Sequence, residues 1–424
     1  RQARDVDSVL VGQDDVASIL YTAGATGLPK GVMLTHANLW VNGRHCADWA
    51  ETTYSDVGVA SLPLFHSYAL THVIAELWME GATLVWISRF DPVACFEAMA
   101  KYKATAFHGV ATIYYALINH PKVDEYAARI NLRYCVTVAA ATPEPILNAW
   151  NEKFTPLSEG YGITEAGPVV LMNPLSGKGV QKANSCGVPI VPEIEVAAVN
   201  ADHQFVKTGE IGELVVKGPN VMKGYWKNPE ATAETVRDGW LFTGDLGYMD
   251  EDDYLVVMGR SKSLLIGSDG EKYSPEGIEE ALVDNSKLID QSMLHNNQNA
   301  YTIGLIVPNI QEINRLVVKH GLEPGSDEGI DYALKLLKHE VGAYFKHGRL
   351  AGMFPERWLP ACFAVLPEAF TEKNLMINST FKMVRGRINE KYATLIDFLY
   401  TPEGKNHLNE INRLNLKNWY RTES

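Results

Sequence analysis

Residues 21–31 hold the first side chains whose types and spacing could do chemistry, because three glycines alternate there with hydroxyl and ammonium groups. Glycine lets the backbone approach an anion closely and turn its N–H groups toward it. A threonine hydroxyl and a mobile lysine cation suit the β- and γ-phosphates of a nucleotide, although the spacing is not that of a Walker loop. The alternative is a glycine-rich surface turn. The residues that we assign to phosphate binding are Thr22, Gly24, Thr26, Gly27 and Lys30.

A carboxylate and an aromatic ring follow at 160–165, on a segment that begins with two closely spaced glycines. Magnesium takes oxygen ligands from one or two carboxylates and from phosphates, so Glu165 is our candidate magnesium ligand. The alternative is a solvated glutamate. The ring of Tyr161 could stack on a nucleobase, with an ordinary core aromatic as its rival interpretation.

Three further polar side chains have types that suit a nucleotide or a carboxylate substrate. Asp245, in a Thr-Gly-Asp segment, can accept hydrogen bonds from both hydroxyls of a ribose, and its alternative is a turn aspartate. Arg260 offers a charged fork for ribose or phosphate oxygens, and its alternative is a surface arginine. His66 lies between Phe65 and Tyr68, where a hydrogen-bonded core histidine is the usual alternative.

These segments, in this order, resemble the motifs of the adenylate-forming (AMP-binding) superfamily of acyl-CoA synthetases, luciferases and peptide-synthetase adenylation domains. The resemblance covers essentially the whole chain, and the ending at 370–385 is similar to that of bacterial long-chain fatty acid–CoA ligases. The matching segments are 21–38, 62–67, 160–165, 243–245 and 259–260.

The resemblance implies roles for individual residues. Thr164 would contact the α-phosphate, while Glu159 and Gly160 would line the nucleotide and acyl sides of the site. His66 would lie near the carboxylate that is activated. Asp245 and Arg260 would form the ribose-binding pair.

The resemblance also implies two lysines near or within a mobile C-terminal domain. Lys382 would be the catalytic lysine, whose cation stabilises the charge that develops as pyrophosphate leaves. Lys262 would be the hinge about which the small domain rotates between half-reactions. We expect the neighbouring cations Lys373, Arg385 and Arg387 at the surface.

The implied activity is an AMP-forming acyl-CoA ligase that uses ATP, Mg²⁺ and CoA. A fatty acid, with a long chain favoured, would become acyl-AMP and then acyl-CoA. Two alternatives stay open: an acyl-AMP ligase that serves a carrier protein, and a degenerate nucleotide- or acyl-binding homologue with little turnover.

Three departures from the family pattern bear on that activity. Ala23 and Ala25 stand where Ser or Thr is usual, and each lost hydrogen bond to a charged group costs about 1.5–3 kcal/mol. The segment 139–143 carries alanines where the family has a glycine-rich turn beside adenine. Family members also carry about 150 further residues, enough for a subdomain of ordinary size, before the phosphate loop. We therefore expect a fragment, a processed form or a shortened homologue.

Composition excludes several classes of partner. The net charge is −13 and no basic block alternates with aromatics, which disfavours nucleic acid. No apolar run reaches the roughly 20 residues of a membrane-spanning helix, whereas peripheral membrane contact and a homodimer stay open. The five cysteines show no CxxC pairing, so a reducing cytoplasm fits best.

Apolar strand-like runs alternate with helix-length segments up to about residue 260, which predicts an α/β fold. We expect a large domain at 1–260, with stacked sheets, covering helices and a β-rich section, and a smaller mobile α+β domain at 261–424. Ser274 and Pro275 predict a helix start, with Ser274 as the N-cap. The predicted strands are 16–21, 57–64, 83–87, 104–110, 134–139, 210–217, 254–258 and 301–307, and the predicted helices before 260 are 92–102, 112–119 and 143–153.

Overall fold

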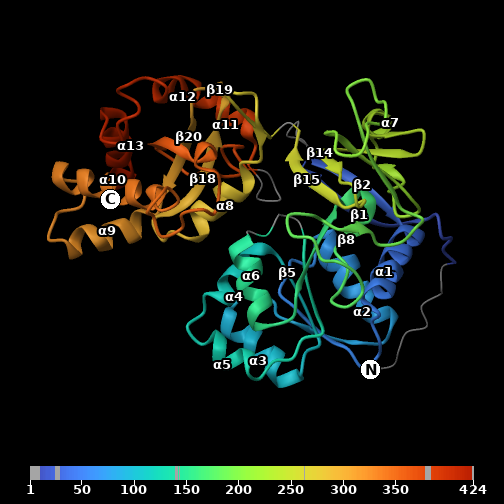
Figure 1. The fold of residues 1–424 in the computed structure, drawn as a ribbon. Helices are drawn as coiled ribbons and strands as arrows, with labels where there is room; N and C mark the ends of the chain where they lie inside the picture. The colour runs from blue at the N-terminus through green and yellow to red at the C-terminus, as the bar shows by residue number, and fades with distance from the viewer. Residues whose placement is uncertain are drawn as a thin grey trace. The chain divides into compact units, whose positions relative to one another are not determined.

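The computed structural model describes residues 10–23, 29–138, 142, 144–261, 263–377 and 383–422 (Figure 1). Contacts within the chain divide it into two compact units. The first unit ends at Val257, and the second consists mainly of the chain from Met258 onward.

A seven-stranded sheet forms the centre of the first unit, in the order β4-β3-β5-β6-β7-β8-β9. The first five strands of that order are parallel, and β8 and β9 continue the sheet in antiparallel pairs. Strands β5 and β6 are buried at every residue, as is typical of parallel strands that helices cover on both faces. The strands are β3 (Val57–Ala60), β4 (Thr83–Trp86), β5 (Ala106–Gly109), β6 (Tyr134–Thr137), β7 (Leu157–Gly162), β8 (Val169–Met172) and β9 (Val188–Pro189).

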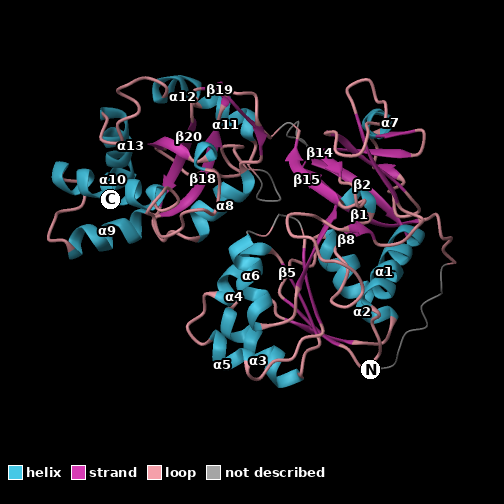
Figure 2. Cartoon of the chain, in the orientation of Figure 1, coloured by secondary structure: helices cyan, strands magenta, loops and turns pink. Residues whose placement is uncertain are grey.

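Helices α3 to α6 lie along one side of this sheet and α1 and α2 along the other (Figure 2). Their starts follow local capping: the Thr35 hydroxyl accepts from the Asn38 N–H, and the Asn38 amide oxygen accepts from the Thr35 N–H in return. Asp91 caps α3 just before Pro92. The helical segments are α1 (His36–Ala50), the π-helix η1 (Tyr68–Ala75), α2 (Glu76–Met79), α3 (Pro92–Tyr102), α4 (Ala111–Ile118), α5 (Val123–Ala127), α6 (Glu144–Lys153), the 3-10 turn η2 (Thr164–Ala166) and α7 (Pro229–Thr235).

Two smaller sheets complete the first unit. One has the order β10-β11-β14-β13 with β15 beside β14, and the other has the order β1-β2-β12. Strand β12 pairs antiparallel with β2, which places Tyr225 opposite Val32. The strands are β1 (Val16–Ala23), β2 (Pro29–Thr35), β10 (Glu195–Val199), β11 (Gly212–Lys217), β12 (Gly224–Tyr225), β13 (Val236–Arg237), β14 (Trp240–Met249) and β15 (Leu255–Arg260).

The second unit is built around β20, which is buried along its whole length between β18 and β21. Strand β18 is antiparallel and β21 parallel to it. The strands are β16 (Leu265–Gly267), β17 (Lys272–Tyr273), β18 (Ile289–His295), β19 (Asn297–Asn299), β20 (Thr302–Pro308) and β21 (Pro360–Val365). The helices are α8 (Glu276–Asp284), α9 (Ile310–Lys319), α10 (Asp327–Gly342), the 3-10 turn η3 (Glu356–Trp358), α11 (Arg385–Lys391), α12 (Ala393–Leu399) and α13 (Glu410–Thr422).

The predicted α/β class is confirmed, and helix α3 has its predicted bounds. Strand β3 ends earlier than predicted, because Pro63 starts a turn in which its carbonyl accepts from the His66 N–H at 3.0 Å. The predicted cap of α8 is wrong: the helix begins at Glu276, and Pro275 rather than Ser274 is the residue at its N-cap. Within the described ranges, every helix is too short or too polar to cross a bilayer.

Candidate active site

The Glu165 carboxylate is the point at which three distant segments of the first unit meet. Glu165 is buried in the turn η2, directly after β7. Its Oε1 accepts hydrogen bonds from the Thr22 hydroxyl at 3.3 Å and from the Tyr225 hydroxyl at 2.9 Å. Thr22 lies on β1 and Tyr225 on β12, so the β1-β2-β12 sheet holds the carboxylate in place. In the described part of the chain, no hydrogen bond to the other carboxylate oxygen is found, and that oxygen can serve as a ligand.

Lys30 joins the same cluster from the other end of the glycine-rich segment. Its Nζ lies 4.8 Å from the centre of the Tyr225 ring, within cation–π range. The Thr22 hydroxyl also lies 3.5 Å from the Lys30 carbonyl oxygen, which ties β1 to β2. The structure therefore brings together Thr22, Lys30 and Glu165, which were predicted to share one site. Tyr225 also belongs to this cluster, although the sequence analysis did not predict it.

Tyr161 and Asp245 form a second buried pair. The Tyr161 hydroxyl donates to Asp245 Oδ2 at 2.6 Å, although the two residues lie on different sheets, β7 and β14. The Tyr161 ring packs in a hydrophobic core, so the core-aromatic alternative describes its environment. Two neighbours fix the turn at Asp245: the Thr243 hydroxyl accepts from the Asp245 N–H, and Glu213 accepts from the Gly244 N–H. Gly244 has a φ of 75°, a conformation that favours glycine.

Thr164 connects the 160–165 segment to the segment at 62–67. The hydroxyl groups of Thr164 and Ser67 lie 3.0 Å apart. His66 precedes Ser67 with an exposed side chain whose Nδ1 accepts from the Tyr68 N–H at 3.2 Å. His66 is therefore not a core histidine.

Glu159 and Gly160 lie on β7, beside the end of β6. A Cβ at Gly160 would lie 2.9 Å from the Leu171 carbonyl oxygen, a backbone atom that cannot easily move, so this position favours glycine. Glu159 is buried, and its Oε1 accepts from the Thr142 N–H at 3.0 Å. Burial raises the pKa of Glu159 to about 7, and the hydrogen bond from Thr142 opposes part of that shift. A carboxyl group at the carboxyl ends of parallel strands occupies the usual place of a ligand site in such folds.

Glu159→Gln should stabilise the protein increasingly as the pH rises. The raised pKa means that folding disfavours the ionised form of Glu159. The wild-type protein therefore loses stability as the pH rises from the ordinary pKa of 4.5 to the folded value of about 7. Glutamine keeps an acceptor for the Thr142 N–H but carries no charge. We expect the free energy of unfolding of the variant, relative to wild type, to rise by about 2 kcal/mol between pH 5 and pH 8. Denaturant titrations at several pH values measure this difference, and a flat profile would contradict the assignment.

The remaining predicted residues lie outside the described residues or in the second unit. Gly24, Thr26, Gly27, Lys262 and Lys382 lie outside the described residues. Arg260 ends β15 and belongs to the second unit, where its carbonyl oxygen accepts from the N–H groups of Ser263 and Leu264.

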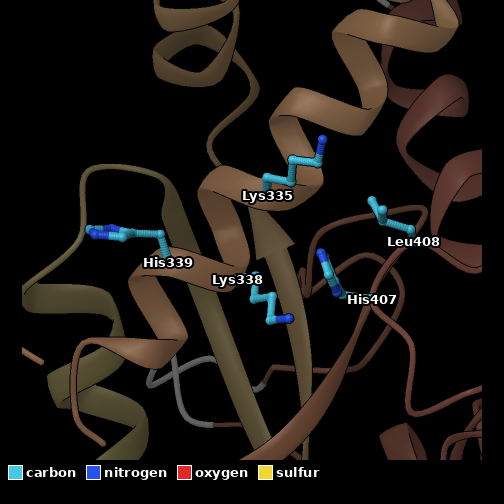
Figure 3. Close-up of a pocket in the computed structure, with 5 residues that line it drawn as sticks. All are labelled: Lys335, Lys338, His339, His407 and Leu408. Carbon is cyan, nitrogen blue, oxygen red and sulfur yellow. The ribbon is translucent and has the colours of Figure 1, made fainter. Parts of the chain in front are cut away.

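A separate hollow of about 460 Å³ lies in the second unit (Figure 3). Burial and the nearby ammonium groups of Lys338 and Lys335 lower the pKa of His407 there. None of the described candidate residues lines this hollow, so it is not the predicted site. Its lining residues are Lys335, Lys338, His339, His407 and Leu408.

Two curated relatives each match about two thirds of this chain. The long-chain-fatty-acid–CoA ligase of Bacillus subtilis (strain 168) is 39% identical over 283 residues, which cover 65% of this chain and 49% of the relative. The feruloyl-CoA synthase of Amycolatopsis sp is 38% identical over 273 residues, which cover 64% of this chain and 55% of the relative. The chain thus spans about half the length of the curated relatives it matches.

A solved structure and a family model extend the comparison. O-succinylbenzoate coenzyme A synthetase (MenE) from Bacillus subtilis, in complex with ATP and magnesium ion, has a TM-score of 0.67 at 25% identity. That alignment covers 91% of this chain and 72% of the other. The family model described as AMP-binding enzyme matches residues 2–226, more than half of the 424 residues. The chain belongs to the AMP-binding enzyme family.

Proposed function

We propose that this chain acts as an ATP-dependent, AMP-forming acyl-CoA ligase. The observation that carries the proposal is the meeting of Thr22, Tyr225 and Glu165, with the Lys30 ammonium over the Tyr225 ring. A buried carboxylate and a lysine cation that contact the same tyrosine, with the lysine at the end of a glycine-rich segment, are suited to a nucleotide and its metal. Family membership and the ATP complex of a structural neighbour support the same activity.

The described residues fit a magnesium ion at Glu165. Two hydrogen bonds orient Oε1, and an oxygen ligand is what this hard cation prefers. When bound, Mg²⁺ supplies positive charge that offsets the charge on the phosphate oxygens. Lys30 would add a second positive charge at the β- and γ-phosphates. Gly24, Thr26 and Gly27 of the same segment would bind these phosphates as well.

The residues around the metal would position the nucleotide. The contact with Ser67 holds the Thr164 hydroxyl in place, and this hydroxyl would donate a hydrogen bond to the α-phosphate. Asp245 would accept from the ribose hydroxyls, with the Tyr161 hydroxyl fixing one of its oxygens. Arg260 would contact ribose or phosphate, and Glu159 and Gly160 would line the nucleotide and acyl sides of the site.

The proposed reaction has two halves. A carboxylate oxygen attacks the α-phosphorus of ATP, the bond from that phosphorus to pyrophosphate breaks, and acyl-AMP forms. The thiol sulfur of CoA then attacks the acyl carbon, and AMP leaves with the electron pair. His66, exposed beside Ser67, would lie near the carboxylate in the first half. Catalysis rests mainly on positioning and electrostatics.

A long-chain fatty acid is the substrate that we favour. The ending at 370–385 and the relative named as a long-chain-fatty-acid–CoA ligase support it. The relative named as a feruloyl-CoA synthase makes aromatic acids the necessary comparison. We also propose a cytoplasmic location, because all five cysteines are unpaired in the structure.

ATP–pyrophosphate exchange with a panel of fatty and aromatic acids tests the proposal. We expect exchange with long-chain fatty acids, followed by acyl-CoA formation when CoA is added. Exchange without acyl-CoA, but with acyl transfer to a carrier protein, would replace CoA by that carrier. ATP binding without exchange for any acid would favour a degenerate binding protein and overturn the ligase proposal.

Two lysines should separate the half-reactions. We propose that Lys382 acts in adenylation and that Lys262, near a domain boundary at about residue 261, is the hinge. Lys382→Ala should lower exchange about 10²–10³-fold, because a cation at the developing charge is lost. Lys262→Pro should impair only one half-reaction, because it restricts the rotation and leaves the site residues in place. Exchange and single-turnover thioester formation measure the two halves, and equal loss of both in Lys262→Pro would argue against a hinge.

A further inference from the structure

A group of ionisable side chains, none of which is assigned to ATP, lies inside the core of the first unit. His72, Glu76 and His108 are all 0% exposed. His72 and Glu76 are four residues apart, on η1 and at the start of α2, so they share one helix face. His108 approaches them from β5. Burying charged and polar groups this deeply is costly unless each has a partner.

Hydrogen bonds hold the Glu76 carboxylate in a single orientation. Its Oε1 accepts from the Thr52 hydroxyl at 2.9 Å and from the Tyr134 hydroxyl at 2.5 Å. Its Oε2 lies 2.9 Å from His72 Nε2, close enough for an ion pair, yet the two groups are not aligned as a hydrogen bond. A metal ion bound by both atoms would replace this direct contact. A metal-binding carboxylate is usually oriented in this way by partners of its other oxygen.

His108 is the unexplained member of the group. Among the described residues, neither of its ring nitrogens has a hydrogen-bond partner. Its ring lies 5.1 Å from the His72 ring and 5.7 Å from the Tyr134 ring, centre to centre. An unsatisfied buried group of this kind costs about 1–3 kcal/mol, so it calls for an explanation, and a bound ion is one that removes the cost.

The three side chains together have the composition of a metal site. One ligand atom from each of His72, Glu76 and His108 lies within 4.8 Å of the others. Two imidazoles and one carboxylate are a ligand set that suits zinc and related divalent transition metals, whereas magnesium prefers oxygen ligands alone. The first histidine also lies in a π-helix, an uncommon element that is frequent at functional sites.

We propose that His72, Glu76 and His108 bind one divalent transition-metal ion of the zinc type inside the first unit. The ion would complete the coordination of His108 and join η1 and α2 to the central sheet at β5. Its ligands are different from the residues proposed for Mg·ATP, so its role is structural. Because all three ligands are buried, the ion would enter as the chain folds, and metal affinity would contribute to folding stability.

Metal analysis of the untagged full chain tests the proposal. The protein is unfolded with guanidinium and chelator, refolded with or without Zn²⁺, and desalted. We expect about one zinc ion per chain after refolding with zinc, a melting temperature that rises with zinc concentration, and visible absorption bands when Co²⁺ replaces Zn²⁺. Wild-type protein that retains no zinc and melts at the same temperature with and without it would overturn the proposal.

Variants separate this site from other metal binding. His108→Leu should retain no zinc, and Tyr134→Phe should weaken zinc binding about 10–100-fold by releasing the carboxylate. His45→Leu is the matched control, because His45 lies on α1 outside the cluster, and it should bind zinc like wild type. Glu165→Gln should also retain zinc, so failure of the ATP site and failure of this site are distinguishable. Equal zinc content in His108→Leu and wild type would refute the assignment, and the wild-type cobalt spectrum decides the question even if a variant fails to fold.

Discussion

Glu165→Gln is expected to lower ATP–pyrophosphate exchange about 10²–10³-fold, since one charged group at the reacting phosphates is removed. Glutamine has the same shape and can still accept the hydrogen bonds that Thr22 and Tyr225 donate to Oε1. The local fold should therefore persist, and the loss should come from weaker metal binding. Raising the magnesium concentration should restore part of the activity. Exchange measured over a range of Mg²⁺ and ATP concentrations gives both quantities.

Tyr225→Phe is the matched control for that change. It removes one hydrogen bond to Glu165 but keeps the aromatic ring beneath the Lys30 ammonium. We expect a loss of about tenfold, which corresponds to one hydrogen bond to a charged group. An exchange rate for Glu165→Gln within twofold of wild type would show that Glu165 is not the magnesium ligand.

Arg385→Ala should destabilise the second unit by about 3–5 kcal/mol, because it leaves a buried carboxylate without its cation. Arg385 forms an ion pair with Glu279, and only 15% of the arginine side chain and 3% of the glutamate side chain are exposed. Glu279 also accepts from the Leu294 N–H, and Arg385 donates to the Leu294 carbonyl oxygen. Burial raises the pKa of Glu279, and Arg385 opposes that shift. The expected surface position of Arg385 is therefore wrong.

The double variant Arg385→Met/Glu279→Leu tests the cause of that loss. Removing both charges avoids the unpaired carboxylate, so it should recover most of the stability lost in Arg385→Ala. Denaturant unfolding of both variants, followed by a probe in the second unit, measures the difference. A cost below about 1 kcal/mol for Arg385→Ala would place the pair among weak surface ion pairs.

Local patterns in the sequence predict local structure well here. Helix α3 was predictable because Asp91 and Pro92 mark its start and apolar residues recur at helical spacing. The buried strand β5 was also predictable, as a short apolar run between turns. Its exact ends were not, because pairing with neighbouring strands decides where a strand stops. The glycine-rich segment and Glu165 were proposed for the site from their chemistry together with the family resemblance.

Contacts between distant residues could not be predicted from one sequence. Tyr225 lies 60 positions from Glu165, and the pairing of β12 with β2 brings its hydroxyl to that carboxylate. His108 reads as part of an apolar run, and nothing near it along the chain indicates that His72 and Glu76 lie opposite. Arg385 follows other cations in sequence, so only its tertiary partner shows that most of its side chain is covered. In each case, strand pairing or packing between distant segments determines which residue the side chain contacts. Such contacts produce no periodic pattern in the nearby sequence.

The hydrogen bond from Tyr161 to Asp245 has a consequence for the assembly of the first unit. It connects β7 of the seven-stranded sheet to β14 of a different sheet, while Glu165 connects η2 to a third sheet through Thr22 and Tyr225. Among the described residues, no single sheet holds all of those proposed for the nucleotide, so we expect a partly folded intermediate to have almost no affinity for it. Saturation with ATP should consequently stabilise all three sheets against unfolding. The affinity for the nucleotide should then report whether the first unit is completely folded.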